Sequence, residues 1–70
     1  MMPLTLASVG VENMIRKIGG NPAVKKHLED MGFIAGGSVT VVSANGGNLI
    51  VNIKESRVAI SREMANKIMV

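Results

Sequence analysis

The stretch SVTVVSANGGNLIVNIKESRVAI, residues 38–60, decides the fold. Apolar and polar residues alternate on both sides of an Asn-Gly-Gly-Asn turn at 45–48, which is the period of strands with one buried face. An Asn-Gly step between two such runs is a strong hairpin signal. A third run, Arg57 to Ile60, follows only Glu55 and Ser56. The stretch therefore predicts a three-stranded antiparallel meander with a second tight hairpin at Glu55 and Ser56.

Upstream of the meander, the chain carries the signals of one short helix. Asn21 is a good N-cap, and Pro22 suits the first helical position. An apolar stripe at helical spacing follows, formed by Val24, Leu28 and Met31. Gly32 then supplies a left-handed stop. Because a helix of about ten residues is marginal alone, its apolar stripe is expected to pack on the β structure.

Both ends of the chain are expected to complete the β structure. Residues 9–18 also read as extended, with a bulge or bend expected near Arg16 and Lys17. Ser61 can cap a short helical turn. The inward side chains of that turn would be Met64, Ala65 and Ile68, before Met69 and Val70 form a closing strand. About five strands with one inserted helix and one helical turn predict a mainly β fold, a small barrel whose closure covers its edges.

Composition limits the chain to one small domain. It has 70 residues, 47% of them hydrophobic, and a formal charge of +3, so we expect residues 1–70 to form a single folded domain. The absence of cysteine excludes disulfides and thiolate metal sites, and a reducing, cytosolic location follows as the default. No apolar run approaches the roughly 20 residues that span a bilayer, so the chain is not expected to cross a membrane.

The sequence offers little for catalysis, cofactors or nucleic acid. His27 is the only imidazole and sits beside the apolar stripe of the helix, so no dedicated metal site is expected. The six Met residues are scattered, which indicates core filling or surface plasticity. Gly36-Gly37 lacks the lysine and helix of a phosphate-binding loop. Acidic residues lie beside most basic ones, so no nucleic-acid partner is expected. We expect no enzyme and no cofactor.

One segment resembles a known family. Leu28, Gly32, Phe33, Gly36 and Val39 follow the pattern L-x-x-[LM]-G-[FLI]-x-x-G-x-x-V of the FeoA family, small cytosolic accessory proteins of bacterial ferrous iron transport. The resemblance implies an SH3-like barrel with a helix between the first strands, and it makes Leu28, Gly32 and Gly36 the structural motif. Many relatives have proline before the second glycine of this segment, where this chain has Ala35.

The resemblance also implies a partner. FeoA-like proteins act on FeoB, a membrane protein that couples a cytosolic GTPase domain to passage of ferrous iron. The expected function is therefore binding and regulation of a FeoB-type transporter from the cytosolic side. The same SH3-like domain occurs at the C-terminus of DtxR-type repressors, so a metal-responsive transcription-regulator module is the alternative.

The density of matching residues places the expected docking surface on the helix and the loop after it. Its candidate residues are Lys25, Lys26, His27, Met31, Phe33 and Ile34. Phe33 can either fill one end of the barrel or protrude beside Ile34, and the sequence leaves both placements open. A second candidate is the first strand with an open groove, although Tyr and Trp are absent there. A weak self-association through Met and Val side chains is also left open.

Overall fold

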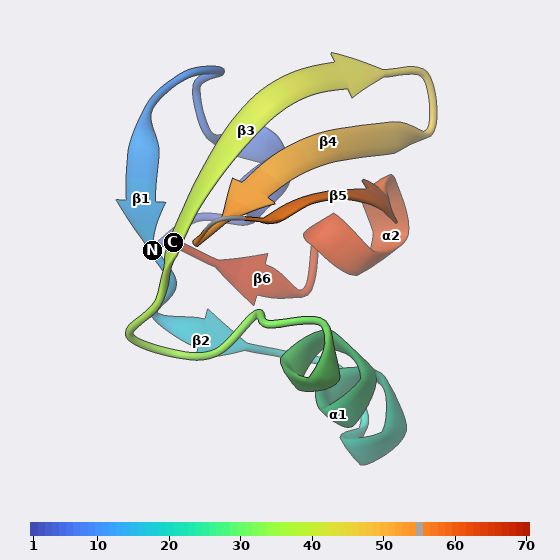
Figure 1. Cartoon of the computed structure of the whole chain (residues 1–70). Helices are drawn as coiled ribbons and strands as arrows, with labels where there is room; N and C mark the ends of the chain where they lie inside the picture. Colours follow the sequence, from blue (N-terminus) through green and yellow to red (C-terminus); the bar gives the residue numbers. More distant parts are fainter. Residues whose placement is uncertain (55) are drawn as a thin grey trace.

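Two antiparallel sheets of unequal size form the β structure (Figure 1). The computed structural model describes residues 1–54 and 56–70. The larger sheet has the strand order β1 (Glu12–Met14), β3 (Ser38–Asn45), β4 (Asn48–Ile53), β5 (Ser56–Ser61). The smaller sheet pairs β2 (Lys17–Ile18) with β6 (Ile68–Met69). The curved β3–β4–β5 ribbon lies over the smaller sheet, which gives the described residues the mainly β, barrel-like architecture that the sequence predicts.

The predicted meander is present. β3 and β4 pair up to Asn45 and Asn48, and Gly46 in the turn between them has φ +57°. The register of this pair shifts between Val41 and Ser43, and a bulge of this kind bends a strand and increases its twist. β4 and β5 pair along their whole length, from Ile53 opposite Ser56 to Asn48 opposite Ser61. The connection between them includes Glu55, which lies outside the described residues.

The segment expected to be one extended strand, residues 9–18, is two strands in different sheets. Ile15 N–H donates to the Gly37 carbonyl at 2.7 Å, so up to this residue the chain faces β3. Arg16 N–H instead donates to the Met69 carbonyl at 2.8 Å, which begins the pairing of β2 with β6. The predicted bend near Arg16 and Lys17 is thus a change of partner between Ile15 and Arg16. It explains why the described residues hold six strands rather than about five.

Both predicted helix caps are confirmed. α1 (Pro22–Asp30) begins after Asn21, whose Oδ1 accepts a hydrogen bond from the Val24 N–H at 2.9 Å. α2 (Arg62–Ala65) begins after Ser61, whose Oγ accepts from the Met64 N–H at 3.2 Å. These side chains satisfy amide donors that the first helical turn leaves without partners.

The N-terminal segment closes the barrel in a way that the sequence did not predict. A 3-10 helix, η1 (Leu4–Leu6), buries Leu4 completely. Met2 and Val70 exchange two backbone hydrogen bonds of 3.0 and 2.8 Å, so the two ends of the chain lie side by side (Figure 1). The small sheet is therefore extended by a third, irregular segment beside β6.

The core between the two sheets is almost wholly aliphatic. Its buried members come from every strand except β1, and from η1, both helices and the loops. They are Leu4, Ile15, Ile18, Leu28, Phe33, Val39, Val41, Leu49, Val51, Ile53, Ile60, Ala65, Ile68 and Val70. Among the described residues, no helix combines the length and the apolar character needed to cross a membrane.

Candidate partner-binding surface

The loop that follows α1 is built by a Schellman motif at the end of the helix. Phe33 N–H donates to the Leu28 carbonyl at 3.0 Å, and Gly32 N–H donates to the Glu29 carbonyl at 2.9 Å. This is the pair of bonds that defines the motif, and it requires the left-handed residue supplied by Gly32 at φ +106°. Leu28 and Phe33 are both fully buried, as is usual for the apolar pair that accompanies such an end. The spacing of Leu28, Gly32 and Phe33 in the sequence thus has a local structural cause.

Burial of Phe33 corrects one part of the predicted docking set. Its side chain is 0% exposed and belongs to the core, so it fills the barrel and cannot touch a partner in this conformation. The reason is the same Schellman geometry, since the residue after the left-handed glycine packs back on Leu28. Of the two placements that the sequence left open for Phe33, the structure selects the buried one.

Ile34 takes the opposite orientation and is held on a rigid turn. Gly37 N–H donates to the Ile34 carbonyl at 3.0 Å, and Gly36 has φ +91°, which together describe a type II turn with Ala35 and Gly36 at its centre. Gly36 N–H also donates to the Ile15 carbonyl at 2.7 Å, so the turn is tied to the chain between β1 and β2. On this anchored turn the Ile34 side chain is 42% exposed.

The basic residues of α1 do not form one face. Successive helical residues are rotated by about 100°, so Lys25 and His27 lie on opposite flanks of the buried Leu28, and Lys26 points outward. All three are exposed. Met31, half-buried, follows His27 by four residues and shares its flank. The predicted set therefore separates into a flank with His27 and Met31, an outer and opposite surface with the two lysines, and the turn that carries Ile34.

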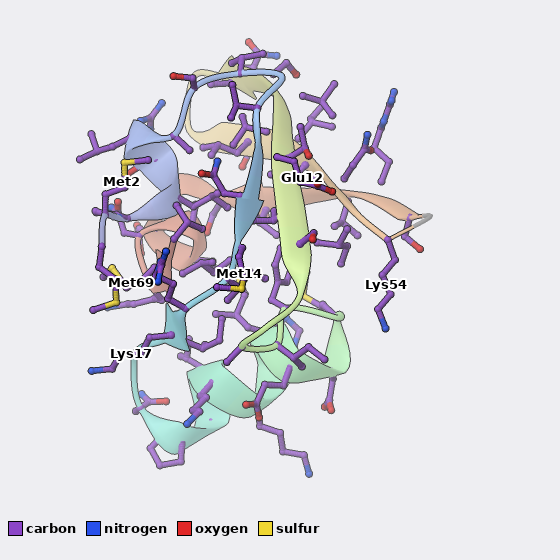
Figure 2. All side chains as sticks on the ribbon, turned by 90° about the vertical axis from the view of Figure 1, so that its left-hand side faces the viewer. Met2, Glu12, Met14, Lys17, Lys54 and Met69 are labelled. Carbon is purple, nitrogen blue, oxygen red and sulfur yellow. The ribbon has the colours of Figure 1, made fainter. Side chains whose placement is uncertain are left out.

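The largest apolar exposure lies elsewhere, in the N-terminal segment. Five large apolar side chains among the first 14 residues are more exposed than Ile34: Met1, Leu6, Val9, Val11 and Met14. Figure 2 shows Met14 on β1, with Met2 and Met69 to one side of it. Val9, Val11 and Met14 belong to residues 9–18, the predicted first strand that is the second candidate docking surface, whereas Met1 and Leu6 were not predicted to lie on a surface of this kind. It is a second apolar surface against which docking at Ile34 can be compared.

Metal ligands do not gather in the part of the chain that the structure describes. No three His, Cys, Asp or Glu residues there lie close enough together to hold an ion. His27 is exposed on α1, where its imidazole has no role in the core.

Comparison with known proteins gives the same family over nearly the whole chain. The family model described as FeoA domain matches residues 2–70. A protein of Methanocaldococcus jannaschii named as a Fe(2+) transport protein A is 36% identical over 70 residues, which cover 100% of this chain and 85% of that relative.

Solved structures agree in fold. A crystal structure of an iron uptake regulatory protein, FeoA, superposes with a TM-score of 0.88 at 22% identity, covering 96% of this chain and 91% of the other. FeoA of Stenotrophomonas maltophilia, solved with zinc and described as a prokaryotic SH3 domain protein, gives a TM-score of 0.73 at 24% identity and covers 99% and 88% of the two chains. These likenesses establish the predicted SH3-like fold.

Proposed function

Because the chain belongs to the FeoA family, we propose that it is a non-catalytic, cytosolic accessory protein of ferrous iron uptake that binds and regulates a FeoB-type membrane GTPase transporter. The observation that carries this proposal is the family match over residues 2–70 together with a relative that is 36% identical along the entire chain. The chain then acts through its surface, and the transporter carries both the nucleotide chemistry and the passage of iron.

The docking surface in this proposal is centred on Ile34. The type II turn holds this residue in a fixed position, so little conformational entropy is lost when a partner covers it. An exposed aliphatic side chain on a rigid support is suited to enter a pocket of another protein, whereas the surrounding polar residues form the rim. His27 and Met31 would lie on the adjoining flank of α1, and Lys25 and Lys26 at the periphery. Phe33 supports this surface from below.

The regulatory mechanism is a shift of populations. A transporter that exchanges between two states of its cytosolic part is moved toward the state that this chain binds more tightly, by an amount equal to the difference in affinity. No transfer of a chemical group is needed.

The direct test is capture of the purified transporter by immobilised protein, with and without guanine nucleotide. We expect retention of the transporter in at least one nucleotide state. No retention in any state would contradict the proposed function.

A pair of matched substitutions tests the position of the docking surface. Ile34→Glu places a charge on the anchored turn and should abolish capture, while the thermal midpoint stays nearly unchanged because the side chain is 42% exposed. Val9→Glu makes the same change on the N-terminal apolar surface, where the side chain is 58% exposed, and should leave capture intact. Loss of capture with Val9→Glu but not with Ile34→Glu would move the interface to the N-terminal surface.

The alternative function, a metal-responsive transcription module, makes a different prediction. Specific DNA binding by this chain would weaken steeply as salt is raised, because phosphate contacts release counterions. On α1, Lys25 and Lys26 lie one turn from Glu29 and Asp30, which opposes a continuous basic footprint. We therefore expect no sequence-specific DNA binding in a salt titration, and a measurable specific complex would favour the alternative.

A further inference from the structure

A polar pocket opens on the outer face of the larger sheet, on the side away from the core. Its volume is about 480 Å³. The Gly36-Gly37 turn forms one wall, and the other lining side chains are Glu12, Ser38, Thr40, Asn52 and Lys54. Gly36 also belongs to the family pattern and to the turn that carries Ile34, whereas the polar side chains of the pocket belong to neither.

A row of paired residues crosses the sheet at this pocket, with a negative charge at one end and a positive charge at the other. Glu12 on β1 pairs with Thr40 on β3, which pairs with Asn52 on β4, which in turn pairs with Arg57 on β5. A carboxylate therefore stands at one end of a cross-strand row and a guanidinium at the other, with neutral side chains between them. Figure 2 shows Glu12 on β1 and, apart from it, Lys54. Lys54 adds a second cation just beyond the end of β4, two residues from Asn52 and off this row.

A hydrogen bond orients the amide at the floor of the pocket. Arg57 Nε donates to Asn52 Oδ1 at 3.1 Å, so the oxygen of this amide is already engaged. The Asn52 NH₂ group is left to donate to a bound acceptor. Thr40 and Asn52 are half-buried, which limits their rotation and holds these polar groups in place.

The donor set excludes several kinds of ligand. A divalent cation prefers several oxygen ligands with carboxylates among them, whereas the described lining residues offer one carboxylate beside an ammonium. A phosphate would be repelled by Glu12. A drug-like small molecule needs apolar or aromatic walls, and the lining side chains are all polar. The remaining class is a ligand that is extended, polar and dipolar.

We propose that this pocket binds an extended segment of a partner protein that carries one basic and one acidic side chain four residues apart, on the same face of the segment. Two strand spacings of about 4.8 Å separate β1 from β4, and Lys54 lies two residues, about 6.6 Å, further along the chain than Asn52, so the two charged ends lie roughly 12 Å apart. An extended chain advances about 3.3–3.6 Å per residue and covers that distance in about four residues, and side chains four residues apart point to the same face of an extended chain. The basic side chain lies against Glu12 and the acidic one against Lys54.

The test uses short synthetic peptides and isotope-labelled protein, followed by amide chemical shifts. The main probe has one lysine and one aspartate separated by three serines, with both ends blocked. Three control peptides of the same length carry two lysines, two aspartates or no charge. We expect the mixed peptide to shift the amides around Thr40 and Asn52, with millimolar affinity that falls as salt is raised.

Charge reversals in the protein should exchange this preference. Glu12→Lys should weaken the mixed peptide roughly five-fold and favour the peptide with two aspartates, and Lys54→Glu should favour the one with two lysines. The double variant, Glu12→Lys with Lys54→Glu, keeps the net charge of the protein. It should bind the mixed peptide again, with the peptide chain running in the opposite direction. The control variant Glu63→Lys with Lys67→Glu exchanges one negative and one positive charge beside α2. It should leave the binding of all four peptides unchanged.

Two results would overturn the proposal. One is equal shifts with all four peptides, and the other is shifts confined to residues outside the pocket. A dispersed amide spectrum for each variant shows that the fold is retained, so loss of binding can be assigned to charge. Because no transporter is used, failure of this test leaves the proposed function intact, and failure of transporter capture leaves this one intact.

Discussion

At the scale of single residues, Gly32 is the position with the least freedom to change. Its φ of +106° is costly for any residue with a Cβ, and a Cβ built there would lie 2.9 Å from Ile53 Cδ1. Both the end of α1 and the burial of Phe33 depend on this backbone conformation. The glycine of the family pattern is therefore explained by the turn that it makes.

Gly32→Ala should lower the free energy of unfolding by about 1–2 kcal/mol, from left-handed strain with a smaller contribution from the displaced Ile53 side chain. Urea unfolding followed by circular dichroism measures this difference. Gly47→Ala is the matched control, because a Cβ there meets nothing within 4 Å and Gly47 does not have positive φ. A destabilisation equal to that of the control would show that Gly32 is not constrained.

Signals carried by single residues correctly predicted where the helices begin and where α1 ends. Asn21, Ser61 and Gly32 act on backbone groups within four residues of themselves, and sequence alone predicts such local interactions. Whether Phe33 is buried or exposed remained open, because after the end of a helix the side chain of either Phe33 or Ile34 can turn inward. The apolar pairing of Leu28 with the residue after Gly32 is the local signal that resolves it.

At the scale of elements, the turn between α1 and β3 carries the exposed Ile34, and one substitution in this turn should make the protein more stable. Ala35 occupies the second position of a type II turn, where φ is near −60° and proline is favoured. Ala35→Pro should raise the free energy of unfolding by about 0.4–1 kcal/mol, because it removes conformations from the unfolded chain. The thermal midpoint should then rise by about 2–8 °C in calorimetry.

The same substitution at Ala44 provides the contrast. Ala44 lies inside β3, paired with Leu49, where proline interferes with strand pairing, so Ala44→Pro should destabilise the protein. A fall in the thermal midpoint for Ala35→Pro would show that the backbone at this turn cannot accept the fixed φ of proline.

Elements that depend on distant partners were harder to predict. The meander follows from its own alternation and its glycine turn, both of which lie within 23 residues of continuous sequence. The division of residues 9–18 between two sheets depends on the carbonyls of Gly37 and Met69, and neither is close in sequence. The pocket on the outer face escaped prediction for the same reason, because three strands contribute to it.

At the scale of the whole molecule, the fold depends on a small aliphatic core that includes a single aromatic side chain, that of Phe33. A chain of 70 residues buries a limited area, and domains of this size usually have about 3–5 kcal/mol of stability. Phe33 is the largest of the fully buried side chains, and it joins the end of α1 to the interior of the barrel. Its loss should therefore affect the entire molecule, whereas loss of its exposed neighbour should not.

Phe33→Ala removes about 3–5 kcal/mol, which is comparable to the total stability, so a large fraction of the molecules should be unfolded at 25 °C without denaturant. Phe33→Leu keeps most of the volume and should stay folded with a loss below about 1.5 kcal/mol. Ile34→Ala, at the adjacent position with 42% exposure, should lose less than Phe33→Leu. Amide spectra and urea unfolding of the three variants measure this order. A cooperative transition near the wild-type midpoint for Phe33→Ala would mean that the aliphatic residues sustain the barrel without the aromatic side chain.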